Sequence, residues 1–336
     1  MAPKKITGKE IAKMAGVSPT TVSLVKKGKM GVGEETRSRI IKLMLSTKYC
    51  EEPDGVPYTY NILQLYRNDI TAMEHLVYTE LSMSIMSACA GMSCRFIQSA
   101  LDGNVAPGLY DKLLQPQNAD AAFIYGDPNL DRLNRLSEMK IPFVILDSSR
   151  KKEECCAVRV DYEKAAYMAT SCLIELGHTD LAYIGNNSGV VYDFNLQTFS
   201  GFQTAMTEHS LSIEPNRIQF NAADEESLYV CLDHALSGHK RPSAILCTTD
   251  HSAIIAIHYL WSKGMRIPED ISIIGIDDLS LSKYIVPSLA TVKIDRQKMG
   301  QLGAELMSQL LKGRSASSVL MSDFEVLKRD SLRVWR

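Results

Sequence analysis

The sequence predicts an all-α helix-turn-helix head at the amino terminus, followed by an α/β body of two doubly wound lobes built on mostly parallel sheets. Three observations predict this arrangement. Residues 6–48 show a basic three-helix pattern. Beyond Pro57, short β-rich runs alternate with helical runs, which is typical of parallel sheets covered by helices on both faces. The alternating units are too many for one sheet of ordinary size, so two lobes are expected.

The first helix is predicted to begin at a capping box. Thr7 is followed three residues later by Glu10, and these two side chains can satisfy free backbone amides at a helix start. Ile11, Met14 and Ala15 fall on one face at helical spacing, so we expect them to pack inward. The glycine directly after Ala15 can end this helix.

A second helix is predicted to start at Ser18, a favoured cap, with Pro19 in the first helical position, where its missing N–H costs nothing. Val22 and Val25 are expected to point inward. A third helix and the rest of a small core are predicted from Glu34, Glu35, Ile40, Leu43 and Met44.

Two helices joined by a tight turn, the second with short polar side chains near its start, are typical of a unit that reads DNA. The charge supports this interpretation. Residues 1–50 hold eleven Lys and Arg against three acids, and the net charge of the chain is −2, so the remainder carries −10. A basic head favours phosphate binding through counterion release. The alternative is an ordinary helical hairpin, which the charge disfavours.

The predicted DNA contacts fall into two groups. The side chains expected to reach base edges are Pro19, Thr20, Leu24 and Lys27. Those expected to position the phosphates are Thr7, Ser18, Thr21, Ser23 and Lys29. For Thr21 and Ser23, capping or simple surface solvation remains an alternative.

The head is predicted to span residues 1–50, a linker 51–59, and an effector-binding and dimerisation domain 60–336. Pro53, Gly55 and Pro57 oppose a helix in the linker. The acids there, Glu51, Glu52 and Asp54, would be repelled by phosphates. We therefore expect an extended linker, and DNA binding set mainly by the helix-turn-helix.

The body shows strand signals at 61–66, 95–98, 121–125, 142–146, 181–185, 217–220, 244–247, 271–276 and 291–294. Helical periodicity lies between many of them, at 162–176, 198–209, 227–236, 252–263 and 297–311. Ligands of such folds bind beyond the carboxyl ends of the strands, so a site between the lobes is expected.

The chain resembles the LacI/GalR family of transcriptional regulators over nearly its full length. In the head, the resemblance is carried by Ile11, Ala12, Ala15, Gly16, Val17, Ser18, Thr21, Val22 and Ser23, and then by Val32, Thr36 and Arg37. In the body it is carried by IPFVILDSS from Ile141, VDYEKAAYMATSCLIELGHTDLAYIG from Val160, Gly201–Phe202, CTTDHSAIIAIHYLWSKGMRIPEDISIIGIDD from Cys247 and PSLATVKID from Pro287.

The resemblance implies a body like type I periplasmic binding proteins. Lobe 1 would hold about 60–160 and 288–315, and lobe 2 about 162–286 and 317–336. It implies a homodimer that binds double-stranded, pseudo-palindromic operator DNA, most simply as a repressor. A small-molecule effector in the cleft, a sugar or sugar derivative, would control operator affinity. The family's hinge helix, which kinks DNA through the minor groove, is not expected from the linker of this chain.

The family pattern also places candidate effector contacts at Asn68, Asp69, Asp147, Thr198, Thr249 and Asp277. Thr198 stands where the family commonly has an arginine, and Thr249 where it often has an asparagine. In the reading helix, Leu24 replaces a frequent arginine; leucine can contact a thymine methyl but cannot form a bidentate pair with guanine. For Asp250 and Asp278 the sequence allows two interpretations, a helix cap or a ligand contact.

Other function classes find little support in the sequence. We find no dinucleotide, phosphate-loop, nucleophile-elbow or zinc-protease motif, so no enzyme activity, cofactor or metal is predicted. The eight cysteines lack metal-ligand spacing. No signal peptide or membrane segment is visible, which predicts a cytoplasmic protein, located at the nucleoid when bound to DNA. The alternative function is a small-molecule-binding protein that shares the body without a transcriptional role.

Overall fold

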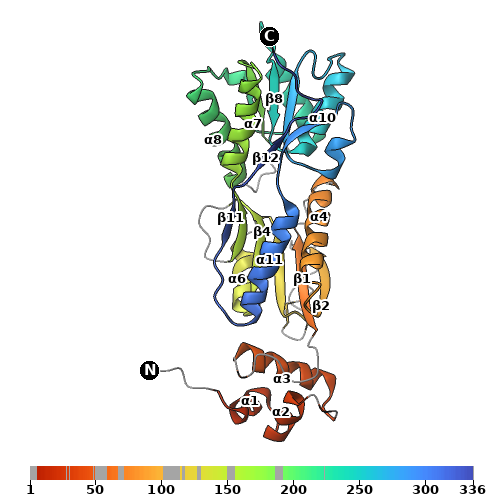
Figure 1. The fold of residues 1–336 in the computed structure, drawn as a ribbon, viewed down its shortest axis with the longest axis vertical. Helices are drawn as coiled ribbons and strands as arrows, with labels where there is room; N and C mark the ends of the chain where they lie inside the picture. The colour runs from red at the N-terminus through yellow and green to blue at the C-terminus, as the bar shows by residue number, and fades with distance from the viewer. Residues whose placement is uncertain are drawn as a thin grey trace.

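The computed structural model describes residues 6–335 except 28, 30, 48, 50–58, 67–71, 101–113, 116–117, 127–129, 150–155, 186–191 and 223. The molecule is elongated, with the helical head at one end, lobe 1 in the middle and lobe 2 at the far end (Figure 1). The predicted linker at 51–59 falls almost entirely outside the described residues, so its conformation stays a prediction.

The head consists of α1 (Gly8–Ala15), α2 (Pro19–Lys26) and α3 (Glu34–Ser46). The capping box of Thr7 and Glu10 is present, and Gly16 ends α1 in the left-handed conformation at φ 66°. The expectation that Met14 packs inward was wrong, because Met14 is 55% exposed and Ala12 takes the inner position. The buried core of the head is Ile11, Ala12, Ala15, Val22, Val25, Ile40, Ile41 and Met44.

Each lobe contains one six-stranded sheet, and the two sheets have matching strand orders. Lobe 1 has the order β11-β5-β4-β3-β1-β2, and lobe 2 has β12-β10-β9-β8-β6-β7. In lobe 1 the strands are β1 (Tyr60–Tyr66), β2 (Cys94–Ala100), β3 (Ala121–Tyr125), β4 (Phe143–Ser148), β5 (Ala157–Val160) and β11 (Val319–Met321). In lobe 2 they are β6 (Leu181–Ile184), β7 (Ile218–Gln219), β8 (Ala244–Cys247), β9 (Ser272–Asp277), β10 (Ala290–Lys293) and β12 (Glu325–Leu327). The strand pairs are parallel except β10 with β12.

Helices cover both faces of each sheet, as the strand–helix alternation predicts. In lobe 1, α4 (Ala72–Ala88) and α11 (Arg296–Leu311) pack on one face, and α6 (Leu130–Glu138) packs on the other. In lobe 2, α7 (Tyr162–Glu175) and α8 (Tyr192–Glu208) cover one face. The other face is covered by α9 (Glu225–Leu236) and α10 (Asp250–Ser262).

The chain crosses between the lobes three times, and two crossings lie later than the family pattern implies. Because β10 belongs to the sheet of lobe 2, the second crossing is at residues 294–295 rather than near 288. Because β11 belongs to the sheet of lobe 1, the third is at residues 322–324 rather than near 316. In each case the chain adds a strand to the sheet before it leaves the lobe: β10 pairs with β9, the preceding strand, and β11 pairs with β5, which lies about 160 residues earlier.

Candidate DNA-reading surface and interlobe site

The start of α2 presents an open surface on the side of the head away from the lobes (Figure 1). Among the side chains predicted to reach bases, Pro19, Thr20 and Lys27 are exposed and Leu24 is half-buried. The α2 helix itself begins as predicted: the hydroxyl Oγ of Ser18 accepts the backbone amide of Thr21 at 3.1 Å.

The residues predicted to position phosphates are more mixed. Ser23, on α2, and Lys29, which follows α2, are both exposed. Thr21 lies 2.8 Å from the Ser18 hydroxyl, so both hydroxyls take part in capping α2. The Thr7 hydroxyl donates to Glu10 within the capping box of α1. A capping role thus accounts for Ser18, Thr21 and Thr7 in the DNA-free chain.

Two contacts hold the α2 end of the head in place. Arg37 of α3 donates a hydrogen bond to the carbonyl of Lys29, which fixes the segment that follows α2. The ammonium of Lys26 lies 4.8 Å from the centre of the Tyr49 ring, a cation–π contact. The predicted phosphate contact Lys29 is therefore anchored through its backbone while its side chain stays exposed.

Between the lobes, two candidate effector residues sit on strained backbone. Asp147 lies near the end of β4 with φ 63°, next to an irregularity in the pairing of β4 with β5. Asp277 ends β9 with φ 138°. Positive φ is uncommon for residues other than glycine and clusters at functional sites. Asn68 and Asp69 fall outside the described residues, so their proposed roles stay predictions.

Asp277 forms a buried ion pair across the segment that links the lobes. Nη2 of Arg296 lies 3.1 Å from its carboxylate, and Nη1 donates to its backbone carbonyl at 2.8 Å. The Arg296 side chain is only 8% exposed. Burial raises the pKa of Asp277 well above its ordinary value, and the neighbouring guanidinium of Arg296 opposes that rise.

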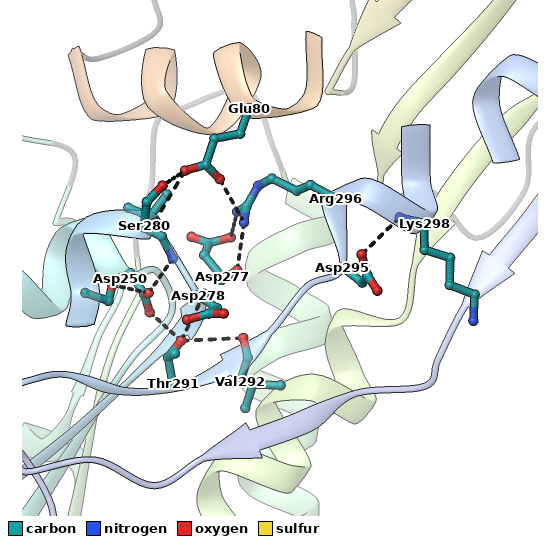
Figure 2. A network of polar contacts seen from close by, with 12 residues as sticks. Glu80, Asp250, Asp277, Asp278, Ser280, Thr291, Val292, Asp295, Arg296 and Lys298 are labelled. Atoms are coloured by element: carbon teal, nitrogen blue, oxygen red, sulfur yellow. Dashed lines mark hydrogen bonds and ion pairs between the residues drawn. The ribbon is translucent and has the colours of Figure 1, made fainter. Parts of the chain in front are cut away.

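Glu80 of α4 is a second residue of lobe 1 in this network (Figure 2). Its carboxylate lies 3.8 Å from Nη1 of Arg296 and accepts hydrogen bonds from the amide and hydroxyl of Ser280 in lobe 2. Among the described residues, no hydrogen-bond acceptor contacts the buried Nε of Arg296. The site therefore combines carboxylate acceptors with one donor that is still available.

The carboxylate of Asp147 accepts a hydrogen bond from the Tyr162 hydroxyl at 2.5 Å. Burial raises the pKa of Tyr162 well above its ordinary value, and the negative charges of Asp147 and Asp277 raise it further. The hydrogen bond from Tyr162 to Asp147 therefore adds the first residue of α7 to the site. We use the name interlobe cluster for Glu80, Asp147, Tyr162, Asp277, Ser280 and Arg296.

Asp250 has a structural role beside this cluster. It is the first residue of α10, and its carboxylate accepts hydrogen bonds from the Leu279 amide at 2.9 Å and from the Ser282 and Thr291 hydroxyls at 2.5 Å each. Burial raises its pKa to about 6, while these hydrogen bonds lower it. The carboxylate of Asp278 accepts a hydrogen bond from Nη2 of Arg329 at 2.5 Å. Asp250 and Asp278, for which the sequence allowed either a helix cap or a ligand contact, thus both bind protein groups.

The two predicted threonines are likewise occupied by protein groups. Thr249 is the N-cap of α10, with its hydroxyl accepting the Ser252 amide at 3.1 Å. Thr198 is fully buried, and its hydroxyl donates to the Phe194 carbonyl at 3.0 Å and contacts the Tyr183 hydroxyl at 2.8 Å. Neither was predicted as part of such networks. The structure places Asp147 and Asp277 at the carboxyl ends of β4 and β9 and leaves Thr198 fully buried.

Sequence reasoning missed Glu80, Tyr162, Ser280 and Arg296. A local signal was available for two of them. Asp161 caps the helix that begins at Tyr162, and Asp295 caps the helix that begins at Arg296. In the described part of the chain no group of His, Cys, Asp or Glu is arranged to hold a metal ion. No described helix is long and apolar enough to cross a membrane.

Comparison with known proteins agrees with this architecture. Residues 7–51 match the model for bacterial regulatory proteins of the lacI family, and residues 170–332 match that for the periplasmic binding protein-like domain. Over 339 residues the chain is 26% identical to the probable HTH-type transcriptional repressor ExuR of Bacillus subtilis, covering 98% of each chain. It is 28% identical to the HTH-type transcriptional repressor PurR of Haemophilus influenzae, covering 90% of each.

Solved structures share the fold. The transcriptional regulator CelR–cellobiose complex superimposes with a TM-score of 0.69 at 20% identity, covering 97% of this chain and 99% of the other. A LacI family transcriptional regulator from Enterococcus faecium with bound ribose gives 0.69 at 21% identity, covering 82% of this chain and 100% of the other. The three-helix head, the two lobes with matching strand order and both family matches lead to one conclusion: the chain belongs to the lacI family of bacterial regulatory proteins.

Proposed function

We propose that this protein is a sequence-specific DNA-binding repressor whose operator affinity is controlled by a small molecule bound at the interlobe cluster. The observation that carries the proposal is the exposed start of α2 on a head that faces away from the lobes. An α-helix with short polar side chains at its start fits the major groove. Pro19, Thr20, Leu24 and Lys27 are its proposed base contacts.

The proposed effector is a sugar or sugar derivative. Its hydroxyls would donate to the carboxylates of Asp147 and Asp277, and one of its oxygens would accept the free Nε–H of Arg296. Both lobes contribute to the cluster, so a ligand there would change how the lobes sit on each other. The names of two structural relatives mention sugars, cellobiose and ribose, which supports this class.

A homodimer is part of the proposal, because an apolar strip runs along one side of both lobes. The outer face of α4 exposes Leu76, Met83 and Met86. The segment at and after the short helix η2 (Ser280–Lys283) exposes Leu281, Tyr284 and Val286. The contact of Glu80 with Ser280 joins the two parts. A second copy of the chain fits this strip, and two heads would then read a pseudo-palindromic operator.

The runner-up function is a small-molecule-binding protein without a transcriptional role. The basic head favours the regulator, because a binding protein alone has no use for an exposed reading helix. A regulator of this kind acts on chromosomal DNA in the bacterial cytoplasm, and the proposal assigns it no catalytic step.

DNA binding is tested by fluorescence anisotropy with fragments selected from genomic DNA. We expect affinity to fall steeply with salt. Thr20→Ala should change preference at one base position, whereas Lys29→Ala should weaken all sequences about equally. Lys240→Ala, an exposed lysine of lobe 2, is the matched control and should have no effect. Binding that ignores salt, or no binding at low ionic strength, would contradict the proposal.

Effector binding is tested by a thermal-shift screen of sugars, sugar phosphates and nucleobases on the full chain, because a ligand that binds the folded state raises the melting temperature. Asp277→Asn should abolish the shift caused by a hit, whereas Asp233→Asn, a half-exposed acid of α9, should leave it intact. Equal shifts in both variants would place the ligand elsewhere.

A further inference from the structure

Among the described residues, an ion pair joins the head to lobe 1 at the end of the lobe opposite lobe 2 (Figure 1). Nζ of Lys42, on α3, lies 2.9 Å from Oδ1 of Asp120 and donates to the carbonyl of Ala119 at 3.1 Å. The other carboxylate oxygen of Asp120 accepts the backbone amide of Asn61 at 2.9 Å. Asp120 directly precedes β3, and Asn61 lies in β1, so the pair joins the head to two adjacent central strands.

This ion pair differs from those on the surface. The Asp120 side chain is 4% exposed and that of Lys42 is 34% exposed. In the pair of Lys263 and Asp233, at 3.6 Å, both side chains are more than half exposed. A buried carboxylate is costly unless it is paired and hydrogen-bonded, whereas exposed pairs contribute little. Among the described residues, the Lys42–Asp120 pair is thus a strong candidate for fixing the head on the body.

The contact leaves the DNA-reading surface uncovered. It is made by α3, which lies against lobe 1, while α2 lies on the far side of the head (Figure 1). The linker sequence, with Pro53, Gly55 and Pro57, opposes a helix that could set the orientation of the head. A direct contact between head and lobe 1 can do this instead.

We propose that the Lys42–Asp120 pair docks each head on its own lobe 1 with α2 facing outward, and so carries the position of lobe 1 to the DNA-reading surface. This inference rests on the proposed repressor function. Docking lowers the ordering cost of DNA binding, because the head is already oriented. It also means that when lobe 1 turns relative to lobe 2, the head turns with it.

The sign of one substitution separates docking from simple electrostatics. Removing a negative charge near DNA should leave operator affinity unchanged or raise it. Loss of docking should lower it. We therefore expect Asp120→Asn, which keeps an acceptor for the Asn61 amide, to weaken operator binding by roughly threefold to tenfold, the order expected for one partly buried pair. Glu138→Gln, a 64% exposed acid of lobe 1, is the matched control and should not weaken binding.

A double-mutant cycle tests the contact without DNA. Lys42→Met, Asp120→Asn and the double variant of the full chain are compared by melting temperature and by operator affinity. Docking predicts that the double variant has a melting temperature and an operator affinity no lower than those of the more impaired single variant, because the same interaction is lost in each. Lys263→Met with Asp233→Asn, a more exposed pair, is the control cycle and should show near-additive effects.

Additive melting-temperature effects for Lys42 and Asp120, or unchanged or tighter operator binding by Asp120→Asn, would overturn docking. If the wild-type chain bound no DNA at all, the repressor proposal would fail, yet the melting-temperature cycle would still report whether the head is docked. The two failures are therefore distinguishable.

Discussion

Asp147 and Asp277 occupy matching places in the two lobes. β4 and β9 stand third in sheets of matching order, and each strand carries its aspartate at its carboxyl end on positive φ. Each aspartate contacts the first residue of the helix that follows a crossing between lobes, Tyr162 for Asp147 and Arg296 for Asp277. The two aspartates therefore occupy equivalent positions, although β12 pairs antiparallel with its neighbour and β11 pairs parallel with its own.

The chemistry of the two halves differs. The carboxylate of Asp147 accepts a hydrogen bond from a neutral hydroxyl, whereas that of Asp277 is paired with a guanidinium that also lies 3.8 Å from Glu80. A neutral donor can be replaced by a ligand hydroxyl with little change in charge. An ion pair in a buried site resists such exchange, because each partner would lose its counter-charge. The comparison indicates that the pair of Asp277 with Arg296 fixes the cluster, whereas the pair of Asp147 with Tyr162 is the exchangeable contact.

The largest expected effect comes from removing the cation. Arg296→Met leaves Asp277, Asp147 and Glu80 without the guanidinium, so unfolding free energy at neutral pH should fall by about 3 kcal/mol, as for other broken buried pairs. The loss should shrink in acid, where the carboxylates are protonated. Chemical denaturation at several pH values measures this. Arg266→Met, which breaks a surface pair with Asp270, is the control and should change little; an equal loss there would refute the special role of Arg296.

The next effect is a pH dependence of the unfolding free energy that comes from Asp250 in lobe 2. The pKa of Asp250 is raised to about 6, mainly by burial, so the folded chain binds this proton more tightly than the unfolded chain does. Its contribution to stability is complete below the unfolded pKa of about 4 and is lost as pH rises through 6. Asp250→Asn should flatten the stability profile between these values. A profile identical to that of the wild type would contradict this assignment.

A smaller effect is expected at the pair of Asp147 with Tyr162. Tyr162→Phe removes one hydroxyl from Asp147, and loss of such a hydrogen bond should lower unfolding free energy by about 1–2 kcal/mol. We expect the cost to stay below that of Arg296→Met, measured in the same denaturation series. If Tyr162→Phe were the more damaging change, the two pairs would have the reverse roles.

The smallest effect concerns the bridge between lobes. Glu80→Gln keeps an acceptor for Ser280 but removes the charge that lies 3.8 Å from Arg296. Because Glu80 is partly exposed, the change in stability should be under about 1 kcal/mol. The apparent affinity for an effector identified by thermal shift should change by only about twofold to threefold. Titration calorimetry can detect such a change, and an unaltered affinity would separate Glu80 from the effector response.

The head and the main strands could be predicted from the sequence because their signals are local. The capping box at Thr7 and the Ser18–Pro19 start of α2 are read within a few residues. Met14 was misplaced because Ala12 shares the inner face, and spacing alone does not choose between them. The short strands β5, β11 and β12 were not predicted, since two of them pair across about 160 residues of chain.

The interlobe cluster could be predicted only in part. The family pattern identified Asp147 and Asp277, but their partners depend on how distant segments meet. Glu80 and Ser280 are separated by 200 positions, and no local pattern announces their contact. Thr198 and Thr249 looked like ligand contacts because the pattern marks positions, whereas the folded structure gives their hydroxyls protein partners.

The positive φ values of Asp147 and Asp277 restrict how this protein can diverge. At Asp147 the φ of 63° lies in the left-handed region that glycine, asparagine and aspartate adopt most readily, and the φ of 138° at Asp277 is rarer still for a residue with a side chain, so most replacements at these two places would distort the strand ends. Tyr162 and Arg296 begin ordinary helices and carry no such restriction. New ligand preferences in descendants of this protein should therefore arise at the two helix starts, with the aspartates kept as a fixed frame.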